Sequence, residues 1–70
     1  MVNPVKDLLT MLEISWKNNN YEKITFILTN CHYECSIDDI TYLNRYFFKI
    51  KSDEFEVFVN INNLGAVRLE

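Results

Sequence analysis

The 70-residue sequence has little glycine, proline or cysteine, with one, one and two residues of each. So little glycine and proline excludes collagen-like and low-complexity chains. Hydrophobic residues make up 49% of the chain, which excludes intrinsic disorder because enough apolar surface can be buried to offset the ordering entropy. No apolar run approaches the roughly 18 residues of a membrane-spanning helix. We therefore expect one folded domain over residues 1–70, with no membrane segment.

The charge balance is weakly acidic, with ten acidic residues against seven basic ones and a net charge of −3. This balance disfavours a protein that binds nucleic acid through net charge alone. The N-terminus lacks the basic, apolar and small-residue succession of a signal peptide. We expect a cytoplasmic protein with Cys31 and Cys35 as thiols. A core in so short a chain rarely supplies more than about 3–5 kcal/mol, so self-association is the expected supplement.

Residues 4–17 are predicted to form an amphipathic helix. Asn3 followed by Pro4 is a typical helix start, with a capping residue and then proline at the first helical position. The run Asn18–Asn20 favours a turn after it. Apolar side chains recur at helical spacing and form one stripe, at Val5, Leu8, Leu9, Leu12 and Trp16, widened by Met11 and Ile14.

The remainder, residues 23–69, is predicted to be a β region because its apolar residues alternate with a period of two. The alternation predicts strands at residues 24–29, 32–36, 45–51, 55–61 and 66–69. Residues 36–43 fit either a bent strand or a helical turn, and we favour the strand. The predicted fold class is α+β, an N-terminal helix packed on a strongly bent antiparallel sheet.

Several predicted strands have apolar side chains on both faces. One face can pack on the helix stripe, whereas the second contains Ile27, Phe47 and Phe58 and needs another cover. This second apolar face can be covered either when the sheet closes into a barrel or when a second subunit packs on it. We therefore predict a homodimer or ring with these three residues as the candidate interface, and an unidentified protein partner.

The segment from Cys31 to Cys35 contains the only histidine, His32, between two thiols. Structural zinc usually needs four ligands, and no second ligand pair exists. Residues four apart in a strand lie roughly 13 Å from each other, and strand neighbours point to opposite faces. A Cys–His dyad is therefore disfavoured, with a metal ion between subunits as the remaining alternative. We predict no catalytic residue, no metal site and no cofactor, and hence a protein that is not an enzyme.

Three segments resemble parts of a known family. Residues Ile24–Asn30 resemble its first strand and polar turn, Arg45–Ile50 its third strand, and Val57–Val67 its closing pair of strands with a 3₁₀ turn between them. Laid end to end, the chain resembles the Sm-like family, especially its bacterial Hfq branch. This resemblance implies a helix followed by a small, strongly bent barrel that assembles into rings. In size and element order the chain is also similar to YopT-like prophage proteins, which suggests a phage-encoded, dimeric protein.

The Sm-like resemblance implies an alternative function, the binding of single-stranded RNA by an oligomer. Exposed aromatics with basic neighbours can stack on bases. Where the Hfq branch has a Lys-His pair that contacts uridines, this chain has Ile61-Asn62, so we favour protein interaction. The candidate RNA-binding residues are Tyr46, which matches a stacking aromatic, the nearby Arg45 and Lys49, and the amides Asn60 and Asn62.

Overall fold

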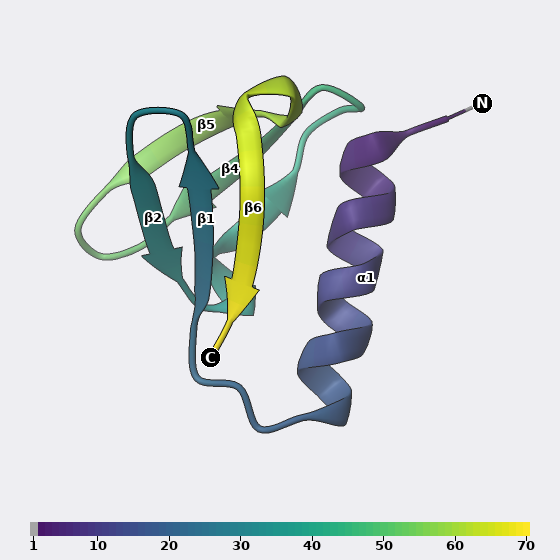
Figure 1. Ribbon diagram of the computed structural model, residues 1–70, viewed down its shortest axis with the longest axis vertical. Helices are drawn as coiled ribbons and strands as arrows, with labels where there is room; N and C mark the ends of the chain where they lie inside the picture. Colours follow the sequence, from purple (N-terminus) through teal and green to yellow (C-terminus); the bar gives the residue numbers. More distant parts are fainter. Residues whose placement is uncertain (1) are drawn as a thin grey trace.

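The computed structural model describes residues 2–70 and contains one helix beside two three-stranded antiparallel sheets (Figure 1). The predicted α+β class, with an N-terminal helix packed on antiparallel β-structure, is confirmed. The strand order is β2-β1-β6 in one sheet and β3-β4-β5 in the other. The elements are α1 (Pro4–Asn18), β1 (Ile24–Leu28), β2 (His32–Cys35), the 3₁₀ turn η1 (Ile37–Asp39), β3 (Ile40–Tyr42), β4 (Phe47–Lys51), β5 (Glu56–Asn60), the 3₁₀ turn η2 (Ile61–Asn63) and β6 (Leu64–Leu69).

Helix α1 begins as its sequence predicts. The Asn3 side chain caps it by accepting a hydrogen bond from the Lys6 N–H at 3.1 Å, and Pro4 occupies the first turn. The Asn3 amide also donates to the Tyr42 hydroxyl at 2.8 Å, which ties the start of the helix to β3. The helix ends at Asn18, one residue beyond the predicted end.

The apolar stripe of α1 faces the sheets, but it is narrower than predicted. Val5 and Leu12 are buried, and Leu8, Leu9 and Trp16 pack against the core. The prediction that Met11 and Ile14 widen the stripe is wrong, because 65% and 55% of their surfaces are exposed. Met11 and Ile14 therefore lie outside the part of the helical face that the sheets cover.

The chain crosses from one sheet to the other through η1. Residues 36–43, for which the sequence favours a strand over a helical turn, contain a 3₁₀ turn and then a strand. The Ser36 N–H donates to Asp39 Oδ2 at 3.0 Å, and the Asp39 N–H donates to the Ser36 carbonyl at 3.1 Å. These local bonds satisfy backbone groups that would otherwise extend β2, so the strand stops and β3 starts in the second sheet.

The chain returns to the first sheet through η2 and pairs β6 with β1. The last strand begins at Leu64, two residues before the predicted start, and its register shifts at Ile27 and Leu28. A Cβ atom at Gly65 would lie 3.3 Å from the Ile27 carbonyl oxygen, so the only glycine allows close approach of the two backbones at this irregularity.

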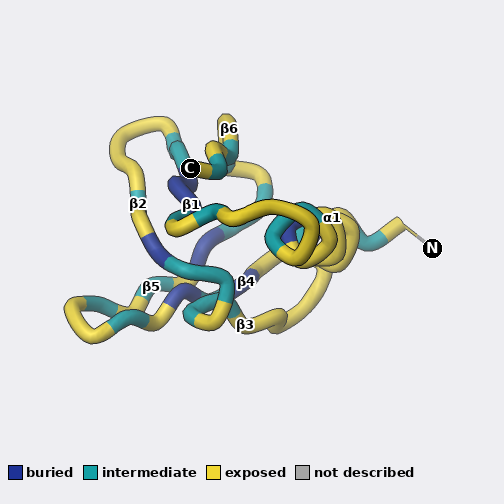
Figure 2. Tube along the Cα trace, turned by 90° about the horizontal axis from the view of Figure 1, so that it is seen from below, coloured by how far each residue is buried: buried dark blue, intermediate teal, exposed yellow. Residues whose placement is uncertain are grey.

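The core lies between the two central strands, β1 and β4. The Phe26 and Phe48 rings meet there with centroids 5.0 Å apart and planes tilted by 47°, and both side chains are fully buried. Figure 2 shows buried segments on β1 and β4, with further buried residues on β2, β5 and the inner side of α1. Burial alternates along β4, where Phe48 and Ile50 are buried, whereas in β1 three consecutive residues, Ile24 to Phe26, are buried.

Candidate functional site

The first candidate site is the outer face of β4 and β5. Because Phe48 and Ile50 point into the core, the alternate residues of β4 point away from it. On this side Phe58 lies in the middle of β5 with 63% of its surface exposed, and Phe47 is 36% exposed. We call this surface the β4–β5 face and define it by Phe47, Lys49, Lys51, Glu56, Phe58 and Asn60.

Charged side chains surround the two phenylalanines of the β4–β5 face. Lys49 pairs directly with Phe58 across the strands. Its ammonium group lies 3.7 Å from Glu56, which also lies 4.0 Å from the Lys51 ammonium. Two lysines against one glutamate leave this face slightly basic within an acidic chain. The face thus combines exposed rings with a polar surround, which is the composition of many protein-binding surfaces.

The third predicted interface residue, Ile27, lies elsewhere. It belongs to β1, where it pairs with His32 of β2 and Ala66 of β6, and it is half-buried. Phe26, the residue before Ile27, points into the core, so Ile27 points to the outer side of the sheet. Thr25, two residues before Ile27, lies on the same outer side. The prediction that Ile27, Phe47 and Phe58 share one face is therefore wrong. Ile27 lies on the outer face of the first sheet, whereas Phe47 and Phe58 lie on the outer face of the second.

The predicted RNA-binding residues gather mainly around the turn before β4. The Asn44 side chain shapes this turn by accepting hydrogen bonds from the Tyr46 and Phe47 N–H groups, at 2.8 and 3.0 Å. The Tyr46 carbonyl accepts from the Ile61 N–H at 2.8 Å, which brings the turn against η2. The Arg45 guanidinium lies over the Tyr46 ring, 4.8 Å from its centroid. Tyr46 is 46% exposed, so nearly half of its surface is open to solvent.

The amide candidates lie beside this turn, and Lys49 lies farther along β4. Asn60 pairs with Phe47 across the sheet, and its Oδ1 accepts from the Asn62 N–H at 2.9 Å. An amide oxygen has two lone pairs, so Asn60 can still offer an acceptor as well as its NH₂ donors to a ligand. The structure therefore brings Tyr46, Arg45 and the two amides to one end of the second sheet.

The cysteines occupy unlike positions in the hairpin of β1 and β2. Cys31 is exposed, whereas Cys35 points inward and is buried, and both are free thiols. Burial, and secondarily the charge of Asp39, raises the pKa of Cys35 from 9.0 to about 12, so its thiol stays protonated and a poor nucleophile. A hydrogen bond with Cys31 is the main cause that raises the pKa of the Tyr33 hydroxyl. Within residues 2–70, no three potential metal ligands gather at one point.

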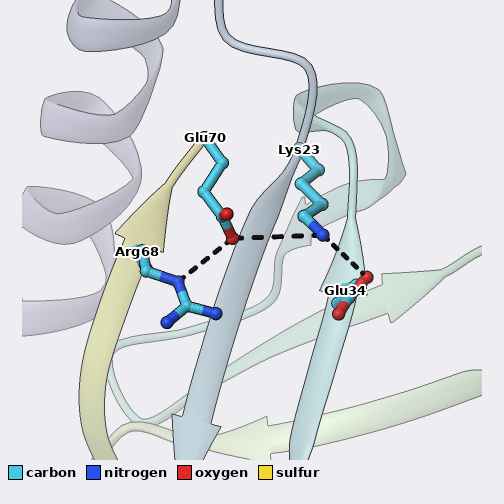
Figure 3. Close-up of polar contacts among 4 residues, drawn as sticks. All are labelled: Lys23, Glu34, Arg68 and Glu70. Carbon is cyan, nitrogen blue, oxygen red and sulfur yellow. Dashed lines mark hydrogen bonds and ion pairs between the residues drawn. The ribbon is translucent and has the colours of Figure 1, made fainter.

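The outer face of the first sheet contains a row of charges that the sequence analysis did not anticipate (Figure 3). Arg68 Nε lies 3.0 Å from Glu70, whose carboxylate lies 4.0 Å from the Lys23 ammonium. Lys23 lies in turn 3.3 Å from Glu34. Lys23 and Glu34 lie in the first half of the chain and Arg68 and Glu70 at its C-terminus, and they meet because β1 pairs with both β2 and β6. Lys23, Glu34 and the pair of Arg68 and Glu70 are far apart in the sequence, so no local sequence pattern predicts that they meet. The contacts among them follow from the register of the three strands.

None of the helical segments among residues 2–70 has the length and apolar character needed to cross a membrane. Comparison with known proteins found no family model, no curated protein and no solved structure that matches this chain.

Proposed function

We propose that this chain is a small, non-enzymatic interaction module that forms a homo-oligomer through the β4–β5 face and, as an oligomer, binds a protein partner. The observation that supports this most is Phe58, a large apolar side chain in the centre of β5 with 63% of its surface in solvent. Phe47 lies one diagonal position away on the neighbouring strand. Burying an aromatic side chain of this size is worth about 1.5–3 kcal/mol, so a second copy of the chain that covers both rings would stabilise the assembly substantially.

The position of β5 at a sheet edge also supports self-association. In the order β3-β4-β5, one side of β5 pairs with β4 and the other has no strand beside it among the described residues. The same holds for β6 in the first sheet. An edge strand presents free N–H and C=O groups to which another chain can add a strand. A second copy that pairs along β5 would extend the sheet and place its own side chains beside Phe58 on the same face.

We include an Sm-like layout in this proposal. Its support is the order of the elements, in which a helix precedes the strands, η2 links β5 to β6, and β6 returns to β1. A cytoplasmic location is part of the same proposal, and the two free thiols are compatible with it.

The test of this proposal compares two exposed apolar side chains. Phe58→Thr removes the ring from β5 and keeps a residue that suits a strand. The matched control is Ile14→Thr, at an exposed position of α1 on another surface. Light scattering coupled to size exclusion is expected to give a multiple of the 8.4 kDa chain mass for the wild type and the control, and a smaller mass for Phe58→Thr. Dissociation of the Ile14 variant alone, or an unchanged Phe58 variant, would place the interface elsewhere.

A second candidate function is the binding of single-stranded RNA around Tyr46. The observation that favours it is the Arg45 guanidinium over an exposed Tyr46 ring, next to Asn60 and Asn62. Stacking on an aromatic side chain is worth about 1–3 kcal/mol per base.

Fluorescence anisotropy with short U-rich and A-rich RNAs at moderate salt tests this function. Tyr46→Ala is expected to abolish binding, whereas Tyr46→Phe, which retains the ring, is expected to bind as the wild type does. Absence of binding by the wild type, or equal binding by the alanine variant, would reject the RNA function.

A further inference from the structure

A hollow of about 350 Å³ opens on the outer face of the first sheet, opposite the core. Ile27 and Leu28 supply an apolar part of its lining, and Asn30 and His32 line it from the hairpin between β1 and β2. Arg68 lines it from β6. No carboxylate lines it, although acidic residues outnumber basic ones in the chain as a whole. The hollow therefore combines an apolar surface with hydrogen-bond donors and a fixed positive charge.

Thr25 also lines this hollow and contains an unexplained polar atom. The residue is only 2% exposed, and its Oγ1 is buried without a hydrogen-bond partner. A buried hydroxyl that makes no hydrogen bond destabilises a fold, and such a group in a native structure calls for a partner. Its neighbours in the register are Glu34 on β2 and Arg68 on β6. Their side chains are 49% and 61% exposed, so they can move to admit a ligand.

The guanidinium of Arg68 is only partly engaged. Its Nε donates to Glu70 at 3.0 Å, and Figure 3 shows the two terminal nitrogens turned away from that carboxylate. The terminal nitrogens of an arginine can bind one oxyanion in a bidentate manner. The two nearby carboxylates already have partners, since Glu70 pairs with Arg68 and Lys23, and Glu34 pairs with Lys23.

We propose that this hollow binds a small ligand with an apolar body and one oxyanion group, with the body on Ile27 and Leu28 and the oxyanion between Arg68 and the Thr25 hydroxyl. His32 and Asn30 would add donors from the hairpin side. This site lies on the sheet that does not contain Phe58, so it is independent of the interaction face proposed above. Carboxylates and phosphate monoesters share the required chemistry, and the experiment separates them.

Amide chemical shifts in a ¹⁵N-labelled sample report binding of three probes of similar size, namely benzoate, phenyl phosphate and the uncharged benzyl alcohol. At physiological salt and millimolar probe concentration, at least one anion is expected to give saturable shifts at residues 25–32 and 66–68. Benzyl alcohol is expected to bind much more weakly. The stronger anion identifies whether the natural ligand is a carboxylate or a phosphate. Equal shifts with benzyl alcohol, or no saturable shift with either anion, would overturn the proposal.

Two variants test the named contacts against an exposed control. Arg68→Gln is expected to weaken anion binding by about tenfold or more, as loss of a charged hydrogen bond predicts. Thr25→Val, nearly the same in shape, is expected to weaken it roughly threefold to tenfold. Lys6→Gln on the exposed surface of α1 is expected to bind as the wild type does. Unchanged binding by Arg68→Gln or by Thr25→Val, or an equal loss in Lys6→Gln, would contradict the proposed site.

Discussion

Replacing Thr25 by valine is expected to stabilise the protein, although it removes a polar group from the middle of a central strand. The Thr25 side chain is almost completely buried, and its hydroxyl has no hydrogen-bond partner. Leaving such a group unsatisfied costs about 1–3 kcal/mol. Valine replaces the hydroxyl with a methyl group of similar size, so we expect a gain of about 1–2 kcal/mol in the free energy of unfolding.

That gain is large for a chain of this length. Its core is expected to supply only about 3–5 kcal/mol in total, and 1 kcal/mol shifts the melting temperature of a small domain by about 4–8 °C. Urea denaturation followed by circular dichroism, at one fixed protein concentration, measures the change. Fixed concentration is needed because self-association raises the apparent stability of the folded state.

The control for this measurement is Thr10→Val, at an exposed position of α1. It makes the same chemical change in solvent, away from the outer faces of both sheets, and is expected to alter stability by less than about 0.5 kcal/mol. A Thr25 variant that is no more stable than the wild type would show that the hydroxyl has a partner, such as a bound water. The reasoning from an unsatisfied buried group, and the ligand site built on it, would then lose their basis.

Three further substitutions test the core, the helix start and the buried thiol. Phe26→Ala removes the ring that packs on Phe48 and is expected to cost about 3–5 kcal/mol, as much as the whole core supplies, so circular dichroism should show an unfolded chain. Asn3→Ala removes the cap of α1 and the bond to Tyr42, and urea denaturation should show a loss of about 1 kcal/mol or more. The raised pKa of Cys35 favours the folded state below pH 9, and this stabilisation is lost as pH rises toward about 12. Cys35→Ala should therefore lose less stability than the wild type between pH 8 and 11, and equal losses would contradict the assignment.

The sequence predicts local structure well where one short-range signal dominates. Asn3 and Pro4 define the start of α1, and strict alternation locates β4 and β5 within two residues. In residues 36–43 a helical-turn signal and a strand signal compete. The Ser36 and Asp39 pair closes a 3₁₀ turn, and the residues that follow then form β3. A prediction of a single structure, strand or helical turn, for the whole segment could not describe a 3₁₀ turn followed by a strand.

Long-range pairing explains what the sequence could not predict. Alternation shows that Ile27, Phe47 and Phe58 face away from the helix, but not that they lie on two different sheets. The hollow beside Thr25 exists because β6 pairs with β1, which places Arg68 opposite that residue. Neither residue stands out by type or spacing. The Thr25 hydroxyl can be recognised as buried and unpaired only when the positions of β2 and β6 on both sides of β1 are known.

The mass of the wild-type chain in solution tests the central claim, that the exposed β4–β5 face is covered by a copy of the same chain. Sedimentation equilibrium at micromolar concentration is expected to give at least twice the 8.4 kDa of one chain. A stable, folded species of 8.4 kDa at that concentration would show that Phe47 and Phe58 remain in solvent, and it would contradict the account.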